Sequence, residues 1–359
     1  MEKTSYIAGL GLISATGGNA KSVFAAYRAG INSYATANYF THDHHLLTLS
    51  LVPNGALPPL LDELEEAEVL SFRDERILRM SQVAIAEALG SYQGTTVPLI
   101  FSGPENYAGI NNQLNPHFLR YLQHQTAQTF DTKLSRILAM GRTGTLEALK
   151  LAQYYLSSGA CEFVLIGGAD SCQHSEWLNL LDRQGRIKSE RPESKGDSFV
   201  PGEGAGFILL TANPDQALHN GQYRFALTTP ALAREPGHLY SEEPYLGNGL
   251  DQAFKSALSA LPQGQLISHI YSSINGESFW VKEMGVALTR SSGRFAAAFK
   301  HQHPADSYGD LGAASAAFLI ALSCRENARA SAPSPHLLYA SSDHAFRAAV
   351  CLLPERISA

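Results

Sequence analysis

The sequence predicts an α/β protein with a layered fold, in which helices cover both faces of a sheet and two similar halves follow one another. Three observations support this. Short apolar runs such as 97–101 and 163–166 alternate with helical patterns. Glycines stand at many of the junctions between them, and the same order of strand, glycine turn and helix restarts after about residue 215. Because a strand that is apolar on both faces must be covered on both, the pattern indicates a buried sheet.

The first half, residues 1–215, opens with the apolar run Tyr6–Ile13, which we interpret as a buried strand. A signal-peptide core is disfavoured because Gly9 and Gly11 interrupt the run, and because a turn and a helical pattern follow it at once. The next expected elements are helix, helix, strand, strand, helix and strand at 23–29, 71–89, 97–101, 137–140, 145–156 and 163–166.

The second half, residues 216–359, repeats this order. Its expected elements are helix, strand, helix, strand, helix and a terminal pair of strands at 250–261, 267–273, 282–289, 295–300, 312–323, 337–340 and 346–353. In the first half, a polar segment with scattered aromatic residues, Pro104–Thr132, lies between the expected strands at 97–101 and 137–140. It is long enough to serve a function rather than only to connect.

Composition narrows the class of protein. The chain has 359 residues, of which 45% are hydrophobic and 17% charged, and a net charge of −6 with a pI near 6.1. This balance argues against nucleic acid or an anionic membrane as the main partner. No apolar stretch approaches the roughly 20 residues that span a bilayer. The four cysteines lack C-x-x-C spacing, so we expect reduced thiols, no structural zinc and a cytoplasmic protein.

Two motifs give the chain a family resemblance. Gly167–Ser171 is followed further along by the run Phe199–Gly206. The opening strand Ile7–Ser14 and the helix start Gly312–Ala314 are placed in the same order. With these motifs the chain resembles a β-ketoacyl synthase of the thiolase superfamily over essentially its whole length. The resemblance implies a thiolase-like αβαβα layered fold.

The resemblance also implies a chemistry. In that family a cysteine at a strand-to-helix turn takes an acyl chain from a carrier protein as a thioester, and the helix N-terminus stabilises its thiolate. Two histidines then stabilise the charge that develops when a malonyl thioester loses carbon dioxide. The family uses no metal or cofactor for this reaction, so we expect none here.

The position of the nucleophilic cysteine falls on Arg142 in this chain. The run Arg142–Leu149 resembles the corresponding run of polyketide chain-length factors, in which glutamine commonly replaces the cysteine. A guanidinium is permanently protonated and cannot be a nucleophile, and a cation at a helix N-terminus opposes the dipole. We therefore expect Arg142 to reach an acidic partner or to turn away from the elbow.

Both family histidines are also replaced. The motif that carries the first one matches 272–277 and puts Asn275 at its position, while Gly309 occupies the place of the second, three residues before Gly312. The lysine of the family is displaced too: strict spacing gives Pro304, and Lys300 requires an insertion. The gating loop near the C-terminus is missing, with Ser341–Asp343 near its position.

These losses suggest a specific arrangement. Asp310 follows the second degenerate position, so we hypothesise that an Arg142–Asp310 ion pair plugs the site. The motif Gly202-Glu203-Gly204 fixes a turn below the active site in the family, and a structural role is expected for Glu203.

Other chemically active residues have simpler interpretations. Cys161 and Cys172 are expected to be buried, inert thiols because neither begins a helix after a buried strand. The run Thr41–His45 is expected to be a surface loop rather than a metal site, and His301 and His303 to be solvated loop residues. His344 has no positioned nucleophile to serve as a general base.

By resemblance, the chain is expected to be a non-catalytic, chain-length-factor-like subunit. It would pair with a catalytic ketosynthase and extend acyl chains on an acyl carrier protein, in polyketide or fatty acid biosynthesis. The segment Pro104–Thr132 is the candidate tunnel wall, with Phe118, Tyr121 and Phe130 as candidates to close it. Two alternatives are a catalytically distinct decarboxylase or acyltransferase using Asn275, Arg142 or His344, and a stand-alone acyl-binding scaffold.

Overall fold

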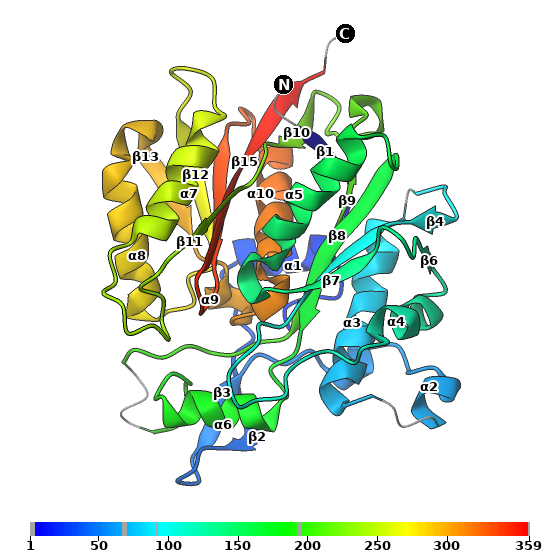
Figure 1. The fold of residues 1–359 in the computed structure, drawn as a ribbon, viewed down its shortest axis with the longest axis vertical. Coiled ribbons are helices and arrows are strands. Elements are labelled where there is room, and N and C mark those ends of the chain that lie inside the picture. The colour runs from blue at the N-terminus through cyan, green and yellow to red at the C-terminus, as the bar shows by residue number, and fades with distance from the viewer. Residues whose placement is uncertain (1–3, 67–69, 91, 192–195, 358–359) are drawn as a thin grey trace.

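The computed structural model describes residues 4–66, 70–90, 92–191 and 196–357. Figure 1 shows a large central sheet with helices on its two outer sides and further helices between its two halves. The strands of the first half that join this sheet are β1 (Ser5–Ser14), β5 (Leu99–Gly103), β7 (Arg136–Ala139), β8 (Phe163–Asp170) and β9 (Gly204–Thr211). Those of the second half are β10 (Tyr223–Leu227), β11 (Ala231–Arg234), β12 (Ile267–Ser272), β13 (Phe295–Gln302), β14 (His336–Ser341) and β15 (Phe346–Arg356).

The helices alternate with these strands. They are α1 (Ala20–Arg28), α2 (Asp62–Glu66), α3 (Phe72–Ala88), α4 (Phe118–Thr126), α5 (Gly144–Ser157), α6 (Ser175–Arg183), α7 (Asn248–Ser259), α8 (Ser278–Arg290), α9 (Ala305–Tyr308) and α10 (Ser315–Arg329). Two small sheets pair β2 (Ala35–Phe40) with β3 (Leu46–Leu49), and β4 (Thr96–Val97) with β6 (Thr129–Phe130). Short 3-10 turns occur at η1 (Asn54–Ala56), η2 (Gly141–Thr143), η4 (Pro214–Gln216), η5 (Ser292–Arg294) and η6 (Gly312–Ala314).

The two halves repeat one topology. The strands of the first half lie in the order β1-β9-β8-β5-β7, and those of the second in the order β10-β15-β14-β12-β13, with β1 beside β10. Matching pairs run in the same sense: β5–β8 and β12–β14 are parallel, and β8–β9 and β14–β15 are antiparallel. The duplicated fold is therefore confirmed. The boundary between 215 and 216 stays a prediction, and it falls within η4.

Three apolar cores make the layers. One core lies between the two halves of the sheet and includes α5 and α10, which Figure 1 places at the centre of the molecule. A second core joins the sheet to α3 and α4, and a third joins it to α7 and α8. The order from one side to the other is helix, sheet, helix, sheet, helix. It places the N-termini of α5 and α10 close together, because η2 contacts η6.

Glycine in β1 has a packing reason. A Cβ on Gly11 would lie 1.9 Å from the carbonyl oxygen of Ala84 in α3, and one on Gly9 would lie 2.0 Å from that of Ala88. Only glycine lets α3 approach the strand this closely. The glycines that argued against a signal peptide are thus contact points of a buried strand.

Several strands and helices were not predicted from the sequence. The strands β10 and β11 are short and were not expected, and neither were the β2–β3 hairpin and α6. The polar segment Pro104–Thr132 is only partly irregular, because it contains α4. No helix of the described residues is long and apolar enough to cross a membrane. Cys161, which is half-buried, and the buried Cys172 and Cys324 are free thiols, and the Cys351 thiol donates to Ala257 O at 3.5 Å.

A buried histidine, His336, with the half-buried His269 beside it, makes the stability of the fold depend on pH. His269 and His336 face each other across β12 and β14, with ring centroids 4.5 Å apart. His336 is 1% exposed, and its Nδ1 lies 2.9 Å from the Ser323 hydroxyl. Burial, with the neighbouring His269, lowers the pKa of His336 to about 3.

The unfolded chain binds a proton on this histidine near pH 6.5, whereas the folded chain does so only near pH 3. The contribution of His336 to the free energy of unfolding is therefore complete above pH 6.5 and is lost as the pH falls toward 3. We expect His336→Gln to reduce the slope of unfolding free energy against pH by up to about 1.4 kcal/mol per pH unit in that window. Urea unfolding at several pH values measures it, with His124→Gln on exposed α4 as the control. Equal slopes in the two variants would contradict the assignment.

Candidate functional site

The site is built around the elbow turn Gly141–Thr143, which joins β7 to α5. Gly141 has a φ of +57°, so the chain turns sharply at the end of the strand. Arg142 follows at the position predicted for the nucleophile and is only 5% exposed. Its side chain points inward, so the expectation that it reaches an acidic partner can be examined directly.

Arg142 lies between two carboxylates. Its Nε donates to Asp310 Oδ2 at 2.8 Å, and its Nη2 also contacts that carboxylate. On the other side its Nη1 donates to Asp343 Oδ1 at 2.6 Å. Burial alone would lower the pKa of Arg142, but these two carboxylates raise it well above its ordinary value. The guanidinium is fixed as a cation at the position that the sequence analysis predicted for the nucleophile.

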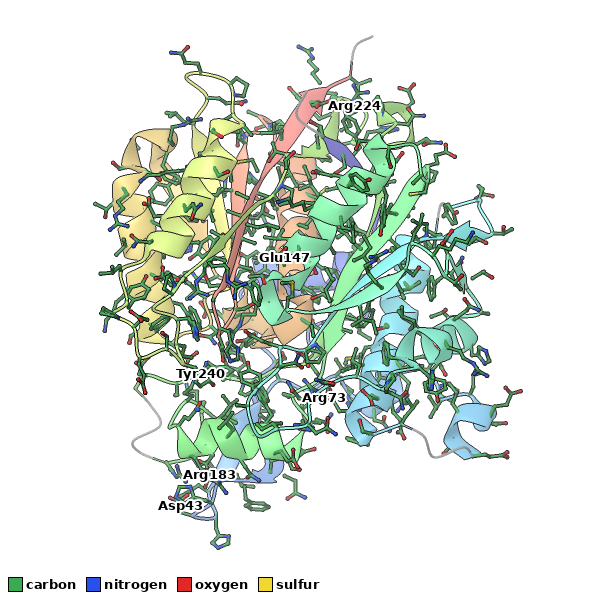
Figure 2. All side chains as sticks on the ribbon, viewed as in Figure 1. Asp43, Arg73, Glu147, Arg183, Arg224 and Tyr240 are labelled. Carbon is green, nitrogen blue, oxygen red and sulfur yellow. The ribbon has the colours of Figure 1, made fainter. Side chains whose placement is uncertain are left out.

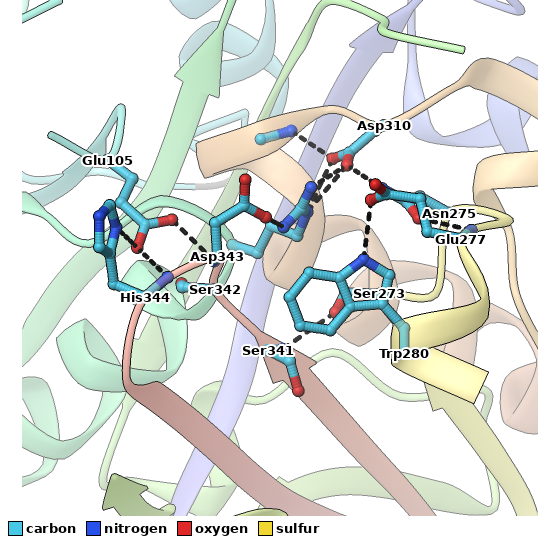
Figure 3. A network of polar contacts seen from close by, with 12 residues as sticks. Glu105, Ser273, Asn275, Glu277, Trp280, Asp310, Ser341, Ser342, Asp343 and His344 are labelled. Carbon is cyan, nitrogen blue, oxygen red and sulfur yellow. Dashed lines mark hydrogen bonds and ion pairs between the residues drawn. The ribbon is translucent and has the colours of Figure 1, made fainter. Parts of the chain in front are cut away.

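The contacts continue into a closed ring. Arg186 donates from Nη1 to Asp343 Oδ2 at 2.8 Å and from Nε to Glu277 Oε1 at 2.6 Å. The Asn275 amide donates to Glu277 Oε2 at 3.0 Å and to Asp310 Oδ2 at 2.9 Å, which closes the ring. We call the ring members the buried ion network; they are Arg142, Arg186, Asn275, Glu277, Asp310 and Asp343. Figure 3 shows Asn275, Glu277, Asp310 and Asp343 converging on one point.

Charge in the buried ion network is divided between the halves of the chain. Both arginines come from the first half, and all three carboxylates come from the second. Buried carboxylates are costly unless each is paired and hydrogen-bonded. Here the two cations hold the pKa of Asp343 well below its usual range, against the opposing effect of burial. The buried ion network therefore joins the halves electrostatically.

Aromatic side chains close the buried ion network. The Arg142 guanidinium lies 5.4 Å from the ring centroid of Trp280, whose indole N–H donates to Glu277 at 3.0 Å. Tyr107 donates to Asp343 at 3.1 Å, and Tyr240, labelled in Figure 2, lies 2.7 Å from Arg186. The Trp280 indole and the Tyr107 hydroxyl thus donate to carboxylate oxygens that the two arginines leave over, whereas the Tyr240 hydroxyl accepts from Arg186.

Gly309, at the second histidine position, cannot carry a side chain where it stands. Its φ is +76°, and a Cβ would lie 2.7 Å from the carbonyl oxygen of Val200. The turn is held close to the 200–204 segment, because Asp310 N donates to Val200 O at 2.8 Å and Gly202 N donates to Asp310 O at 2.8 Å. A Cβ on Gly202 would lie 2.4 Å from the carbonyl oxygen of Tyr308.

Glu203 lies beneath this turn and is fully buried. Its carboxylate pairs with Arg76, with Nε donating at 2.8 Å, and accepts from the Ser171 hydroxyl at 2.6 Å and from Val52 N at 2.8 Å. Both carboxylate oxygens have fixed partners. Through Arg76, Glu203 joins α3 to the turns that contain Ser171 and Glu203 itself. Its neighbour Gly204 leaves no room for a side chain, since a Cβ would lie 2.7 Å from Ile13 O.

The remaining candidates lie outside the buried ion network. His344 shares a hydrogen bond of 2.8 Å with Glu105, which raises the pKa of the imidazole. Burial raises the pKa of Cys172, so that thiol is unreactive. Lys300 is exposed on β13. No group of His, Cys, Asp or Glu that could hold a metal was found among the described residues.

Two histidine predictions have different outcomes. Residues 42–45 form a surface loop, and His42 pairs with Asp182 at 2.8 Å. The prediction of a solvated loop was wrong for His301, because β13 continues to Gln302 and Pro304 ends it only later. His301 contacts the Ser272 hydroxyl at 2.9 Å, and burial lowers the pKa of the imidazole to about 4.

The cavity left at the site is small. Its volume is about 30 Å³, and its lining includes Arg142, Asp310, Tyr107 and Arg73. Ligand pockets usually measure about 300–1,000 Å³, whereas a single water needs roughly 10–15 Å³. The site has room for a water or two, but not for an acyl chain.

A larger groove runs beside the elbow, along β7. It measures about 310 Å³ and is lined by residues that include Leu114, Ile137 and Ala139. The segment Pro104–Thr132 thus does contribute to a groove, but through its first part.

The aromatic residues expected on a tunnel wall need correction. Phe118 is fully buried and Phe130 is 4% exposed, and both belong to the core beneath α3. Phe118 packs on Phe101, with ring centroids 5.2 Å apart. Tyr121 alone is partly exposed, on α4. In this chain Phe118 and Phe130 fill the chain's own core.

Part of the chain is similar in sequence to beta-ketoacyl synthases. The family model for the N-terminal domain of beta-ketoacyl synthase matches residues 142–216, beginning at the elbow arginine. A beta-ketoacyl-[acyl-carrier-protein] synthase III from Pectobacterium atrosepticum is 30% identical over 131 residues. That match covers 34% of this chain and 36% of the enzyme, so it spans just over a third of the relative's length.

Solved structures match over nearly the whole chain. A ketosynthase in complex with its chain length factor from Xenorhabdus doucetiae has a TM-score of 0.74 at 13% identity, over 97% of both chains. The ishigamide ketosynthase/chain length factor has a TM-score of 0.73 at 15% identity, over 98% of this chain and 99% of that one. The chain therefore has the same fold as these ketosynthases. Its segment from the elbow to residue 216 is the part that matches the beta-ketoacyl synthase family.

Proposed function

We propose that this chain is a non-catalytic, chain-length-factor-like subunit. It pairs with a catalytic ketosynthase and helps to set the length of the acyl or polyketide chain made on an acyl carrier protein, in the cytoplasm. One observation carries the proposal: at the nucleophile position, the Arg142 guanidinium is held between Asp310 and Asp343 in a buried site.

The groups that the family reaction requires are each replaced or blocked here. No thiol stands at the elbow to form a thioester. The Asn275 amide donates to Glu277 and Asp310, so its N–H groups are not directed at a substrate. Gly309 brings no side chain, and the cavity of about 30 Å³ admits no acyl group. A separate catalytic chain must supply the chemistry if this one takes part in condensation.

The edge of the sheet at β7 is a suitable surface for a partner subunit. Among the described residues β7 is the last strand in the sheet order, so one of its edges is unpaired. An open edge strand is a template for pairing with another chain. Because β7 runs directly into the elbow turn, a subunit that docks there lies next to the buried ion network.

The same contact supports a role in chain length. The groove of about 310 Å³ lies along β7, so a partner on this edge would cover it. Leu114 and Ile137 are its bulky apolar lining residues, and they replace Phe118 and Phe130 as our candidates for the wall. In this proposal the growing chain reaches the groove from the catalytic subunit and is stopped by these side chains.

The test is co-expression with the ketosynthase encoded beside this chain. We expect the two chains to copurify and condensation on the carrier protein to disappear when either is omitted. Leu114→Ala with Ile137→Ala should shift the product toward longer chains, and Leu288→Ala on distant α8 is the matched control. Turnover by this chain alone would refute the proposal and support the distinct enzyme. A stable homodimer that ignores the ketosynthase would support the scaffold.

A further inference from the structure

A groove between α1 and α10 is lined by several cationic side chains. Its volume is about 370 Å³, which lies within the range of ligand-sized sites. The residues that line it are Lys21, Phe24, Ala25, Arg28, Arg325, Ala328 and Arg329. On a chain with a net charge of −6, this concentration of positive side chains is a local reversal of sign.

Three of these four cations have no counter-ion among the described residues. Arg28 pairs with Glu326, with Nη1 and Oε1 2.8 Å apart. Among the residues that the structure describes, no ion pair is recorded for Lys21, Arg325 or Arg329. Glu326 is the carboxylate that an incoming anion must compete with, and it is already engaged. The groove therefore keeps a net positive charge.

Two of the cations are placed where folding alone gains little. Lys21 lies in the first turn of α1, where a positive charge opposes the helix dipole. The Nε of Arg325 is buried without a hydrogen-bond partner, although its guanidinium lies 5.9 Å from the ring centroid of Phe24. An unpaired buried donor is costly, so the placement of this guanidinium adds little to the stability of the fold.

The spacing of the cations points to an extended anion. Lys21 and Arg28 stand seven positions apart on one face of α1, which corresponds to about 10 Å along the helix axis. Arg325 and Arg329 stand four positions apart on α10 and so share a face. A single phosphate is too short to meet cations spread over this length, whereas carboxylates repeated every three or four residues on a helix match it.

We propose that the groove between α1 and α10 docks an acidic helix of a partner protein. Its carboxylates meet Lys21, Arg325 and Arg329 from the two walls, and its apolar face covers the partly exposed floor at Ala25 and Ala328. This site is on a different face from the β7 edge and does not depend on the chain-length role.

The experiment uses the full chain and a labelled synthetic helical peptide with Glu at positions i and i+4. Fluorescence anisotropy should show binding that weakens as salt is added, because exposed ion pairs are screened. A peptide with Gln in place of Glu should not bind. The triple variant Lys21→Glu/Arg325→Glu/Arg329→Glu should weaken binding about 10-fold or more.

A matched variant separates the groove from net charge. Arg120→Glu/Arg183→Glu/Lys282→Glu reverses three exposed cations on α4, α6 and α8 and should leave binding within about 2-fold. If the groove triple fails to fold, the exposed pair Lys21→Glu/Arg329→Glu serves instead. Equal losses in the groove and control variants, no binding at low salt, or full displacement of the peptide by stoichiometric inorganic pyrophosphate would overturn the proposal. The last result would point to a compact anion.

Discussion

Replacing Arg142 by alanine is expected to lower the free energy of unfolding by about 3–5 kcal/mol, the range for removing one partner of a buried ion pair. The cost is large because two carboxylates lose their cation at once. Asp310 and Asp343 are 5% and 1% exposed, so bulk solvent stabilises their charges little. Urea unfolding of the purified chain, followed by circular dichroism, measures the change.

The matched control is an arginine ion pair on the surface. Arg28 is 51% exposed in its pair with Glu326, so Arg28→Ala should cost no more than about 1 kcal/mol. Asp310→Ala should destabilise the chain as Arg142→Ala does, and should make Arg142 more accessible to an arginine-modifying reagent. Similar small losses for Arg28→Ala and Arg142→Ala would show that the buried ion network does not hold the halves together.

Local sequence pattern was enough to find the elbow and one of its partners. The strand, glycine turn and helix around Arg142 follow one another directly in the chain. The offset from known motifs placed Asn275 and Gly309, and the structure brings these positions together around Asp310. Such positions are predictable because short-range order fixes the turn, and the duplicated fold fixes which turns meet.

The rest of the site depends on contacts that no local pattern carries. Arg186 lies in the irregular segment after α6, and Asp343 in the turn between β14 and β15. They meet only when the two halves pack, and each is an ordinary charged residue in the sequence. Asp343 could have been suspected, since it stands near the position of the missing gating loop. Arg186 gave no such signal.

Phe118 illustrates the opposite error. Aromatic residues in a polar segment suggested a wall for a tunnel. Phe118 and Leu122 are instead spaced by four on α4, which puts both on the face that packs toward α3. The helix was hidden because its other face is polar throughout, so the segment was interpreted as a loop with isolated aromatic side chains.

The buried ion network gives two of the positions predicted from the family resemblance a structural role. The three degenerate positions are not merely vacant, because Arg142 and Asn275 now serve a network that joins the halves. Restoring a cysteine at position 142 would remove the cation that Asp310 and Asp343 require. We therefore expect Arg142→Cys to lower the stability of the chain.

Gly309→Ala is expected to cost clearly more stability than Gly30→Ala, although both glycines have positive φ. Gly30 has a φ of +68° with no atom within 4 Å of an added Cβ, so alanine there should cost roughly 1–2 kcal/mol for the left-handed backbone. At Gly309 the φ is +76° and the added Cβ would lie 2.7 Å from Val200 O. That contact is with backbone held by hydrogen bonds, so a further cost of about 1–3 kcal/mol is expected from overpacking.

Urea unfolding of both variants decides this, and equal losses would show that the 309 turn can relax. If it cannot relax, then histidine at 309 is excluded for the same reason as alanine, whatever its chemistry. The triple change Arg142→Cys/Asn275→His/Gly309→His would then fail to rebuild the catalytic set, because the backbone of the turn, and not only its side chains, has departed from a shape that can present an imidazole. Recovery of condensation activity by this triple variant would contradict the expectation.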